Sequence, residues 1–256
     1  MNFVKWSKVA LIPIILIGIL GCSKGGYREQ LPAHEQLAKA MDLYNRGKYM
    51  KAQIEFQRMI YSFPGQAFTD TVQYYLGLSF SGMKYYPEAI GEFKKFMQAF
   101  PSSQFADDAQ YQIAICHYKQ SPKFSLDQTE TYAAIDEFSM LLSKFPASEF
   151  NGDARDKLDE LNEKLAKKLF RAGMLYFKMN DYEPAQMYFM NVRDNYPNTD
   201  WAVHSVYYTG EVQRKLGNNA EALSTFQNLV VAFPDHKLAE KARKQIAKLS
   251  AKSVGS

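Results

Sequence analysis

The side chains of this 256-residue chain that could do chemistry are, first of all, its histidines and cysteines. The four histidines, one in each region of the chain, are His34, His117, His204 and His236. None of them lies in a metal-ligand spacing such as H-E-x-x-H, and no phosphate-binding glycine loop or G-x-S-x-G elbow is present. Cys116 lies in an apolar helical segment, which favours a small buried hydrophobe over a catalytic nucleophile. The sequence therefore predicts no enzyme, no cofactor and no metal site.

The other cysteine, Cys22, ends a segment that is typical of a secretory signal. Two lysines precede an apolar run from Val9 to Leu20, which is too short for a bilayer-spanning helix of roughly 20 residues. Ile19-Leu20-Gly21-Cys22 resembles a bacterial lipobox, whose cysteine thiol is acylated before cleavage makes it the new N-terminus. We therefore expect a cleaved signal peptide over residues 1–21 and a lipidated tether over 22–31. The alternative is a short membrane anchor with an incidental cysteine.

Five copies of one pattern occupy most of the remaining chain. In each copy a small residue is followed by alanine, phenylalanine and an aromatic residue at fixed offsets, and then by proline. The copies are Ala40/Ala52/Phe56/Phe63-Pro64, Gly77/Ala89/Phe93/Phe100-Pro101, Ala114/Ala134/Phe138/Phe145-Pro146, Gly173/Ala185/Phe189/Tyr196-Pro197 and Gly210/Ala222/Phe226/Phe233-Pro234. Only the third departs from the spacing, by eight extra residues before its alanine. Such a period predicts a repeat array.

Each copy is expected to form a hairpin of two helices. The small residue in the first helix permits close approach, the phenylalanine fills the space beside it, and the proline ends the second helix. These offsets match the tetratricopeptide pattern, although regular copies lie 37 residues apart instead of 34. We therefore predict an all-α solenoid of five tetratricopeptide-like hairpins.

A C-terminal helix is expected to cap the array, with Asp235 as its N-cap. Its apolar stripe is Leu238, Ala242, Ile246 and Leu249. A terminal helix with a polar outer face closes the open end of a stacked array. Binding of this helix to a membrane is the alternative.

Two insertions interrupt the period. The first lies within residues 119–129, where Asp127 and Glu130 fit an N-cap and capping box for the next helix. The second adds 14 residues before the fourth copy, nearly four turns at 3.6 residues per turn. We expect one long helix there, from about Glu149 to Met179. It would divide the array into three repeats over 32–148 and two repeats with the capping helix over 149–250, followed by a tail over 251–256.

Binding is predicted for the inner face of the array. In each first helix, the positions three before and four after the small residue are expected to point into this face. In copies one to three they hold the tyrosines Tyr44, Tyr74, Tyr111 and Tyr118, with Leu37 as an exception. Tyrosine joins a rigid apolar body to a polar tip and suits a peptide-binding groove, although some of these rings could instead belong to the core. The candidates in the C-terminal block are Trp201, His204, Tyr207 and Arg214, with Trp201 either anchoring a partner or stapling the preceding turn.

The signal, lipobox, tether and repeats together resemble the BamD family of outer-membrane protein assembly lipoproteins, from Cys22 to about Leu249. The most specific local features are Asp127-Gln128-Thr129 and the segment Leu161-Asn162-Glu163-Lys164-Leu165-Ala166. Ser23 after the cysteine also resembles lipoproteins that are sent to the outer membrane.

The resemblance implies a lipid-anchored protein on the periplasmic face of the outer membrane of a Gram-negative bacterium. It implies that the C-terminal block binds the periplasmic domains of a BamA-type barrel subunit, and that the N-terminal groove helps receive unfolded outer-membrane precursors. A net charge of +4 without a clustered basic face gives no support for nucleic-acid binding. The competing hypotheses are a tetratricopeptide lipoprotein that scaffolds cell-wall enzymes or proteases, and an envelope enzyme.

Overall fold

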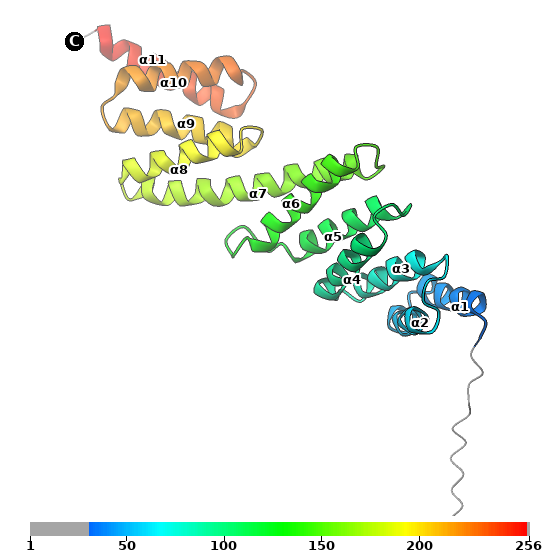
Figure 1. Ribbon diagram of the computed structural model, residues 1–256. Helices are drawn as coiled ribbons and strands as arrows, with labels where there is room; N and C mark the ends of the chain where they lie inside the picture. The colour runs from blue at the N-terminus through cyan, green and yellow to red at the C-terminus, as the bar shows by residue number, and fades with distance from the viewer. Residues whose placement is uncertain (1–30, 255–256) are drawn as a thin grey trace, which may run out of the picture. The chain divides into compact units, whose positions relative to one another are not determined.

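The computed structural model describes residues 31–254, and these residues form eleven α-helices and no β-strand (Figure 1). The helices are α1 (Ala33–Asn45), α2 (Tyr49–Ser62), α3 (Thr69–Gly82), α4 (Tyr86–Ala99), α5 (Ala106–Gln120), α6 (Thr129–Lys144), α7 (Asn151–Lys178), α8 (Tyr182–Asn195), α9 (Asp200–Lys215), α10 (Asn219–Ala232) and α11 (Lys237–Val254). All of them belong to one compact unit, Ala33–Ser256. The predicted all-α class is confirmed.

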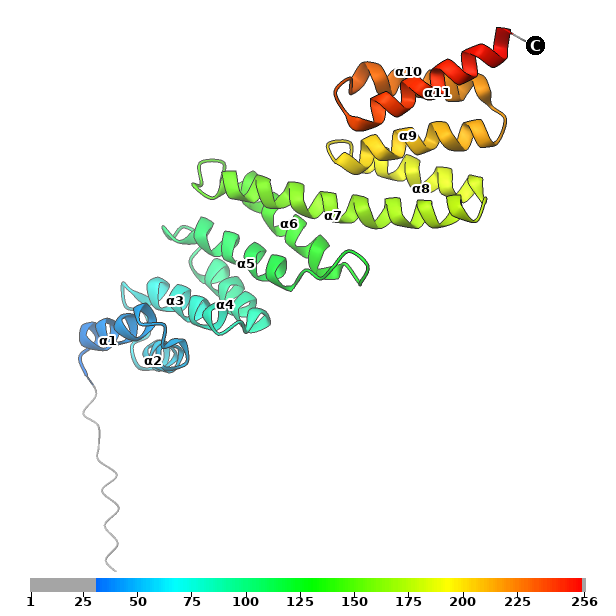
Figure 2. The ribbon, with the colours of Figure 1, turned by 180° about the vertical axis from the view of Figure 1, so that it is seen from behind.

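The helices pack in chain order, because each one lies against the next from α1 to α11. The pairs α1/α2, α3/α4, α5/α6, α7/α8 and α9/α10 are the five predicted hairpins, and α11 packs on α10 and α9. Figure 2 shows the same succession from behind. The core is correspondingly divided into five clusters spread along the stack.

The contact between the small residue and the phenylalanine explains the repeat pattern. A Cβ atom on Gly77, Gly173 or Gly210 would lie 2.6, 2.8 or 2.7 Å from a ring carbon of the phenylalanine sixteen positions later in its own copy. Those phenylalanine rings are fully buried. The first helix therefore needs a small residue where the ring of the second helix rests against it.

Four of the five turns between paired helices place one residue in the left-handed backbone region. Gly47 and Gly217 have φ angles of 68° and 85°, and Lys84 and Asn180 have 63° and 60° at the equivalent places. The left-handed conformation is the usual way to end a helix in a tight turn, and glycine adopts it most easily. Two turns therefore use a residue that is strained there.

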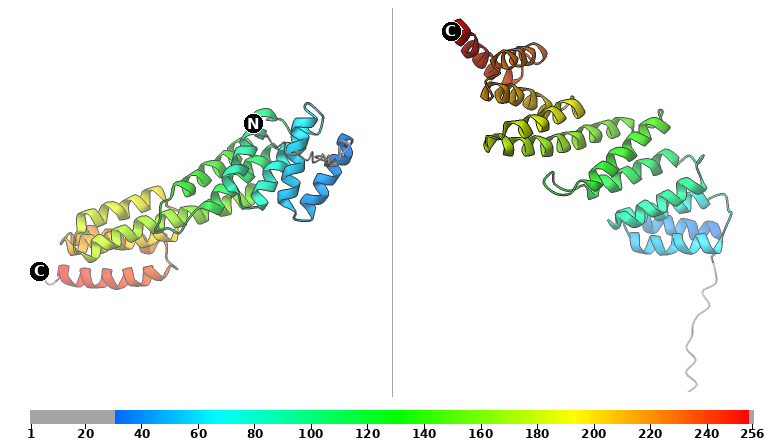
Figure 3. Two further views of the ribbon diagram at one scale, coloured as in Figure 1. Left: turned by 90° about the horizontal axis from the view of Figure 1, so that it is seen from below. Right: turned by 60° about the vertical axis from the view of Figure 1, so that its left-hand side comes forward.

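The predicted long helix is confirmed as α7. It begins two residues after the expected Glu149 and ends one residue before the expected Met179. Ala154 and Leu161 in its first half belong to the core cluster of the third copy, whereas Ala166 and Phe170 in its second half belong to that of the fourth. The views of Figure 3 show this long yellow-green helix running from α6 to α8 without a break. One continuous helix thus carries two adjoining core clusters.

The predicted caps of two helices are wrong. The N-cap of α6 is Gln128, and Asp127 lies outside the helix, where its carboxylate accepts a bond of 2.9 Å from the backbone N–H of Thr129. Glu130 pairs instead with another helix, since its carboxylate is 2.7 Å from Nδ1 of His117. The amide of Gln128 instead donates to three carbonyl groups of the insertion and fixes its end.

The start of α11 is the second such case. The helix begins at Lys237, one residue later than an Asp235 cap would allow, and Nδ1 of His236 accepts from the backbone N–H of Leu238 at 3.2 Å. Leu238, Ala242 and Leu249 are buried against α9 and α10, so the apolar stripe of α11 packs on the array as predicted.

Candidate partner-binding site

Tyr74, on α3, is a core residue. Only 7% of it is exposed, and its ring stacks on Phe105 with the centroids 4.9 Å apart and the planes at 5°. The rings of Phe93 and Phe96 pack on it as well. Burial raises the pKa of its hydroxyl far above the usual value. Tyr74 therefore offers little surface to a partner.

Tyr111 and Tyr118 connect α5 to α7 through their hydroxyl groups. The Tyr111 hydroxyl donates to Asp153 and that of Tyr118 donates to Glu160 at 2.6 Å, both 42 residues further along the chain. The hydrogen bond to Glu160 raises the pKa of Tyr118 to about 12, with burial as the second cause. The Nζ of Lys157 also lies 4.9 Å from the Tyr118 ring centroid. The structure thus brings these two rings onto one surface with α7.

Tyr44 belongs to a different cluster from the other three predicted tyrosines. Its half-buried ring lies edge-on to Tyr49 and Tyr75, with centroids 5.5 and 5.0 Å away. The four predicted groove residues are therefore distributed over two packed interfaces and one partly exposed surface, the last formed by Tyr111 and Tyr118.

In the C-terminal block, Tyr207 and Trp201 pack against other helices, and Arg214 pairs with a residue of its own helix. Tyr207 is 9% exposed and packs on Phe226. Arg214 donates to the buried carboxylate of Glu211 at 2.8 Å. Trp201 packs on Phe170 of α7 in the preceding copy, with centroids 5.0 Å apart.

Trp201 also lines a pocket where the two insertions meet. This insertion pocket has a volume of 430 Å³ and is lined by Lys123, Phe124, Ser125, Glu160, Glu163, Lys164, Lys167 and Trp201. The Nζ of Lys167 lies 4.8 Å from the centroid of Phe124 and 5.8 Å from a ring centroid of Trp201. Lysine beside aromatic rings is a favourable cation–π arrangement. The pocket can therefore accommodate aromatic groups beside a positive charge.

The insertion pocket and the surface of Tyr111 and Tyr118 share Glu160, which lines the one and accepts from the tyrosine of the other. The insertion itself is tied to α7, because Lys164 donates to Ser121 at 2.9 Å and Lys168 donates to the Leu126 carbonyl at 2.5 Å. These bonds hold the loop next to the helix and leave the pocket between them.

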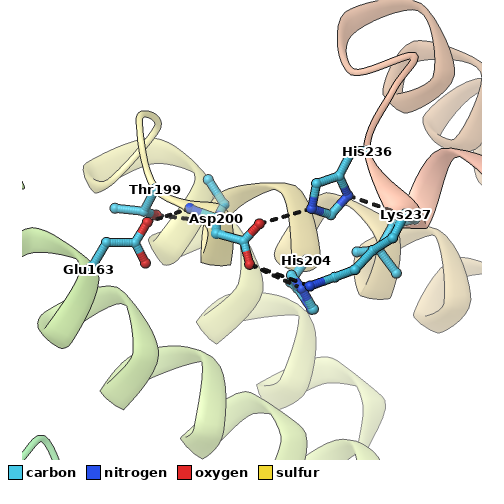
Figure 4. A network of polar contacts seen from close by, with 8 residues as sticks. Glu163, Thr199, Asp200, His204, His236 and Lys237 are labelled. Carbon is cyan, nitrogen blue, oxygen red and sulfur yellow. Dashed lines mark hydrogen bonds and ion pairs between the residues drawn. The ribbon is translucent and has the colours of Figure 1, made fainter.

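His204 belongs to a polar cluster that the sequence did not predict. Figure 4 shows Asp200 between His204 and His236, with distances of 3.4 and 2.9 Å from its carboxylate oxygens to the two Nε2 atoms. Lys237 lies 3.8 Å from the same carboxylate. His236 is separated by 32 residues from His204, so no local spacing could connect them. The one sequence signal was the i, i+4 pair of Asp200 and His204, which share a helix face.

Burial shifts the pKa values in this cluster. It lowers the pKa of His204, which favours the neutral ring. Burial also acts to raise the pKa of Asp200, but the hydrogen bond from His236 and the nearby positive groups outweigh it, and the pKa is lowered overall. The cluster thus pairs an ionised carboxylate with neutral imidazole.

Cys22 lies outside the described residues, so its predicted lipidation stays a prediction. Within residues 31–254, no helix combines the length and apolar character that crossing a bilayer requires.

Five stacked helix hairpins and a closing helix define a tetratricopeptide-type solenoid. The TPR2AB-domain:pHSP90-complex of yeast Sti1 shares this fold at a TM-score of 0.50 and 12% identity, over 86% of this chain and 84% of that one. Residues 29–222 match the YfiO family, described as outer membrane lipoprotein, and the chain belongs to this family. It is 28% identical to "Outer membrane protein assembly factor BamD" of Rickettsia prowazekii, over 86% of this chain and 90% of the relative. The predicted relationship to the BamD family is confirmed.

Proposed function

We propose that this protein is a non-catalytic lipoprotein subunit of the machinery that assembles β-barrel proteins in the outer membrane. The observation that carries the proposal is the family match together with the assembly-factor relative, which covers nearly the whole chain. Lipidation of Cys22 would hold the protein at the membrane. The mature cysteine of such a lipoprotein carries three acyl chains, which exceed the two signals needed for stable anchoring.

The C-terminal block is proposed to hold the periplasmic domains of a BamA-type barrel-forming subunit. Exposed apolar side chains support this assignment, because Leu175, Met179 and Leu216 lie at the ends of α7 and α9 and are 59%, 65% and 44% exposed. Exposed apolar groups gathered at neighbouring turns are typical of protein interfaces. Of the predicted residues, Trp201 and His204 help to hold the hairpins that present these turns.

The surface of Tyr111 and Tyr118, extended by the insertion pocket, is proposed to receive unfolded precursors. A β-strand destined for a membrane barrel carries alternating aromatic side chains, and the pocket offers Phe124, Trp201 and the Lys167 ammonium. Contacts with an open, partly solvated surface are weak and reversible, as transfer to a membrane requires. Burial and strand pairing in the bilayer can then drive insertion without a nucleotide.

The test is co-purification after cross-linking in intact cells and detergent solubilisation of the membranes. A barrel-forming subunit and unfolded barrel precursors are the expected partners. Recovery of cell-wall enzymes or proteases without a barrel subunit would contradict the proposal and favour the alternative scaffold.

Peptide binding tests the precursor surface separately. Lys167→Ala and Tyr118→Ala should each weaken binding of an aromatic peptide from a precursor C-terminus several-fold, because each removes a ring or charge that contacts the peptide. Lys51→Ala, at an exposed position of α2, is the matched control and should bind like the native protein. Equal affinity in all three variants would exclude this surface.

A further inference from the structure

We propose that Asp200, His204 and His236 form a binding site for a divalent transition-metal ion, with Zn²⁺ as the best match. The ligand atoms of the three side chains all lie within 4.8 Å of one another. This site is independent of the proposed assembly function. It would connect the start of α9 to the start of α11, two helices that are separated in the chain by the whole of α10.

The distances suit a tetrahedral ion. Ligand atoms about 2.0–2.1 Å from a tetrahedral zinc lie roughly 3.3 Å from each other. In the structure, Oδ2 of Asp200 is 3.4 Å from Nε2 of His204 and Oδ1 is 2.9 Å from Nε2 of His236, and the three ligand atoms lie within 4.8 Å of one another. Figure 4 shows the carboxylate directed toward both rings. Small side-chain movements would therefore bring all three groups around one ion.

The start of α9 positions two of the three ligands. Thr199 caps the helix through a bond from Ala202 N–H to its hydroxyl, and the backbone N–H of Asp200 donates to Glu163 of α7 at 2.6 Å. Asp200 and His204 are one turn apart and so point to the same side of the helix. The helix start is thus held from both sides, which gives the ligands a fixed base.

The surroundings of His204 give a second argument for a metal site. Its Nε2 is buried and has no hydrogen-bond partner, although it faces Asp200. The rings of Trp201 and Phe170 pack on it, with centroids 5.3 and 5.6 Å away, and restrict its orientation. A buried polar atom without a partner is unfavourable. A metal ion would bind this nitrogen, and the neutral ring is the form that coordinates metals.

Three contacts oppose binding and are small enough to yield. Nδ1 of His236 accepts the 3.2 Å bond from Leu238 N–H, and coordination through Nε2 would place the ring proton on Nδ1 and break that bond. Lys237 puts a positive charge 3.8 Å from the Asp200 carboxylate. Its side chain is 66% exposed and can turn into solvent. Coordination would also break the 2.9 Å hydrogen bond from Nε2 of His236 to Asp200. Two hydrogen bonds and one mobile charge are thus lost for three metal–ligand bonds.

The donor set identifies the class of ion. Two imidazoles and one carboxylate suit Zn²⁺, Co²⁺ and Ni²⁺, whereas Mg²⁺ and Ca²⁺ prefer oxygen ligands alone. Water would complete the tetrahedron, because the chain contributes three ligands. An ion that binds the folded chain but not the unfolded chain would raise the free energy of unfolding through mass action. It would also fasten the capping helix α11 to the last hairpin.

Trp201 allows the site to be tested by fluorescence on the full chain, purified without a histidine tag. In a Trp6→Phe background it is the only tryptophan. Because its ring lies 5.3 Å from that of His204, bound Co²⁺ should quench its emission, and Zn²⁺ should restore the emission by displacement. Mg²⁺ at the same concentration should have no effect.

His204→Gln and His236→Asn should each weaken Co²⁺ binding at least tenfold, whereas His117→Ala, which changes a histidine outside the cluster, should leave it unchanged. Lys237→Ala should tighten binding, since it removes the nearest positive charge. Circular dichroism establishes that each variant is folded. Quenching that is absent in the native chain, or that survives loss of either histidine, would overturn the proposal, as would equal thermal stabilisation by Zn²⁺ in native and histidine variants.

Discussion

The ring of Tyr74 lies face to face with that of Phe105, at 4.9 Å and 5° between planes. One repeat further on, Tyr111 stacks on Phe150 in the same way, at 4.4 Å and 14°. Each tyrosine stands three positions before the small residue of its copy, and each phenylalanine stands immediately before the first helix of the next. A position expected to face a partner thus joins one hairpin to the following one.

Loss of this stacked ring should destabilise the array. Tyr74→Ala removes a buried aromatic side chain and should lower the free energy of unfolding by about 3–5 kcal/mol. Tyr61→Ala is the control, because Tyr61 is 77% exposed on α2, and its effect should stay within about 0.5 kcal/mol. Urea unfolding followed by circular dichroism measures both. Similar midpoints for the two variants would show that Tyr74 contributes nothing to the core.

The contact between glycine and phenylalanine gives a second test of packing. Gly210→Val would place atoms against the ring of Phe226 and should destabilise the protein by about 1–3 kcal/mol. Gly91→Val in α4 is the matched control, because a Cβ there meets no atom within 4 Å. It should be neutral or slightly stabilising, since valine is a better helix former than glycine. Thermal unfolding distinguishes the two, and a Gly210→Val chain as stable as the control would refute the packing argument.

Relief of backbone strain should stabilise the second hairpin. Lys84 has a φ of 63°, so Lys84→Gly should raise the free energy of unfolding by about 0.5–1 kcal/mol. Lys51→Gly, within helix α2, should lower it by a similar amount because glycine is unfavourable in helices. Chemical denaturation measures both changes, and the expectation fails if the two substitutions shift stability in the same direction.

The thiol of Cys116 should be unreactive in the folded protein. Burial raises its pKa to about 11, and the residue is fully buried, so alkylation by iodoacetamide at pH 8 should be slow until urea is added. A folded pKa above the unfolded value gives a stabilising contribution that is present below pH 9.0 and lost as the pH rises through about 11. Mass spectrometry of the labelled peptide measures the rate. Equal labelling with and without urea would exclude a closed core there.

Anchoring can be tested by replacing each of the two cysteines in turn. Cys22→Ala should keep the protein off the outer membrane, because the thiol that would be acylated is missing. Cys116→Ala is the control and should fractionate with the outer membrane like the native chain. Normal fractionation of the Cys22 variant would refute the lipobox assignment.

The repeat array could be predicted from the sequence because its pattern records direct contacts. A Cβ on Gly77 would touch Phe93, and the same spacing recurs in every copy but the third, so the hairpins follow from local sequence alone. The long helix was equally predictable, because the leucines of α7 have helical spacing and the segment contains no proline.

The site was less predictable because a first helix in a stack has neighbours on two sides. The residue at Tyr74 can face either a groove or the next hairpin, and helical period alone does not distinguish them. The capping box failed for a similar reason, since Glu130 is engaged by His117 from another helix. The approach of His236 to Asp200 depends on how α11 returns across α9, which no local pattern encodes.

The unbroken course of α7 has a mechanical consequence. At 1.5 Å per residue, its 28 residues form a rod of about 42 Å. One half is embedded in the core of the third copy and the other in the core of the fourth. The third and fourth copies are therefore joined by a rigid helix and not by a flexible linker. Two partners bound to the third and fourth copies would therefore keep a fixed separation and orientation.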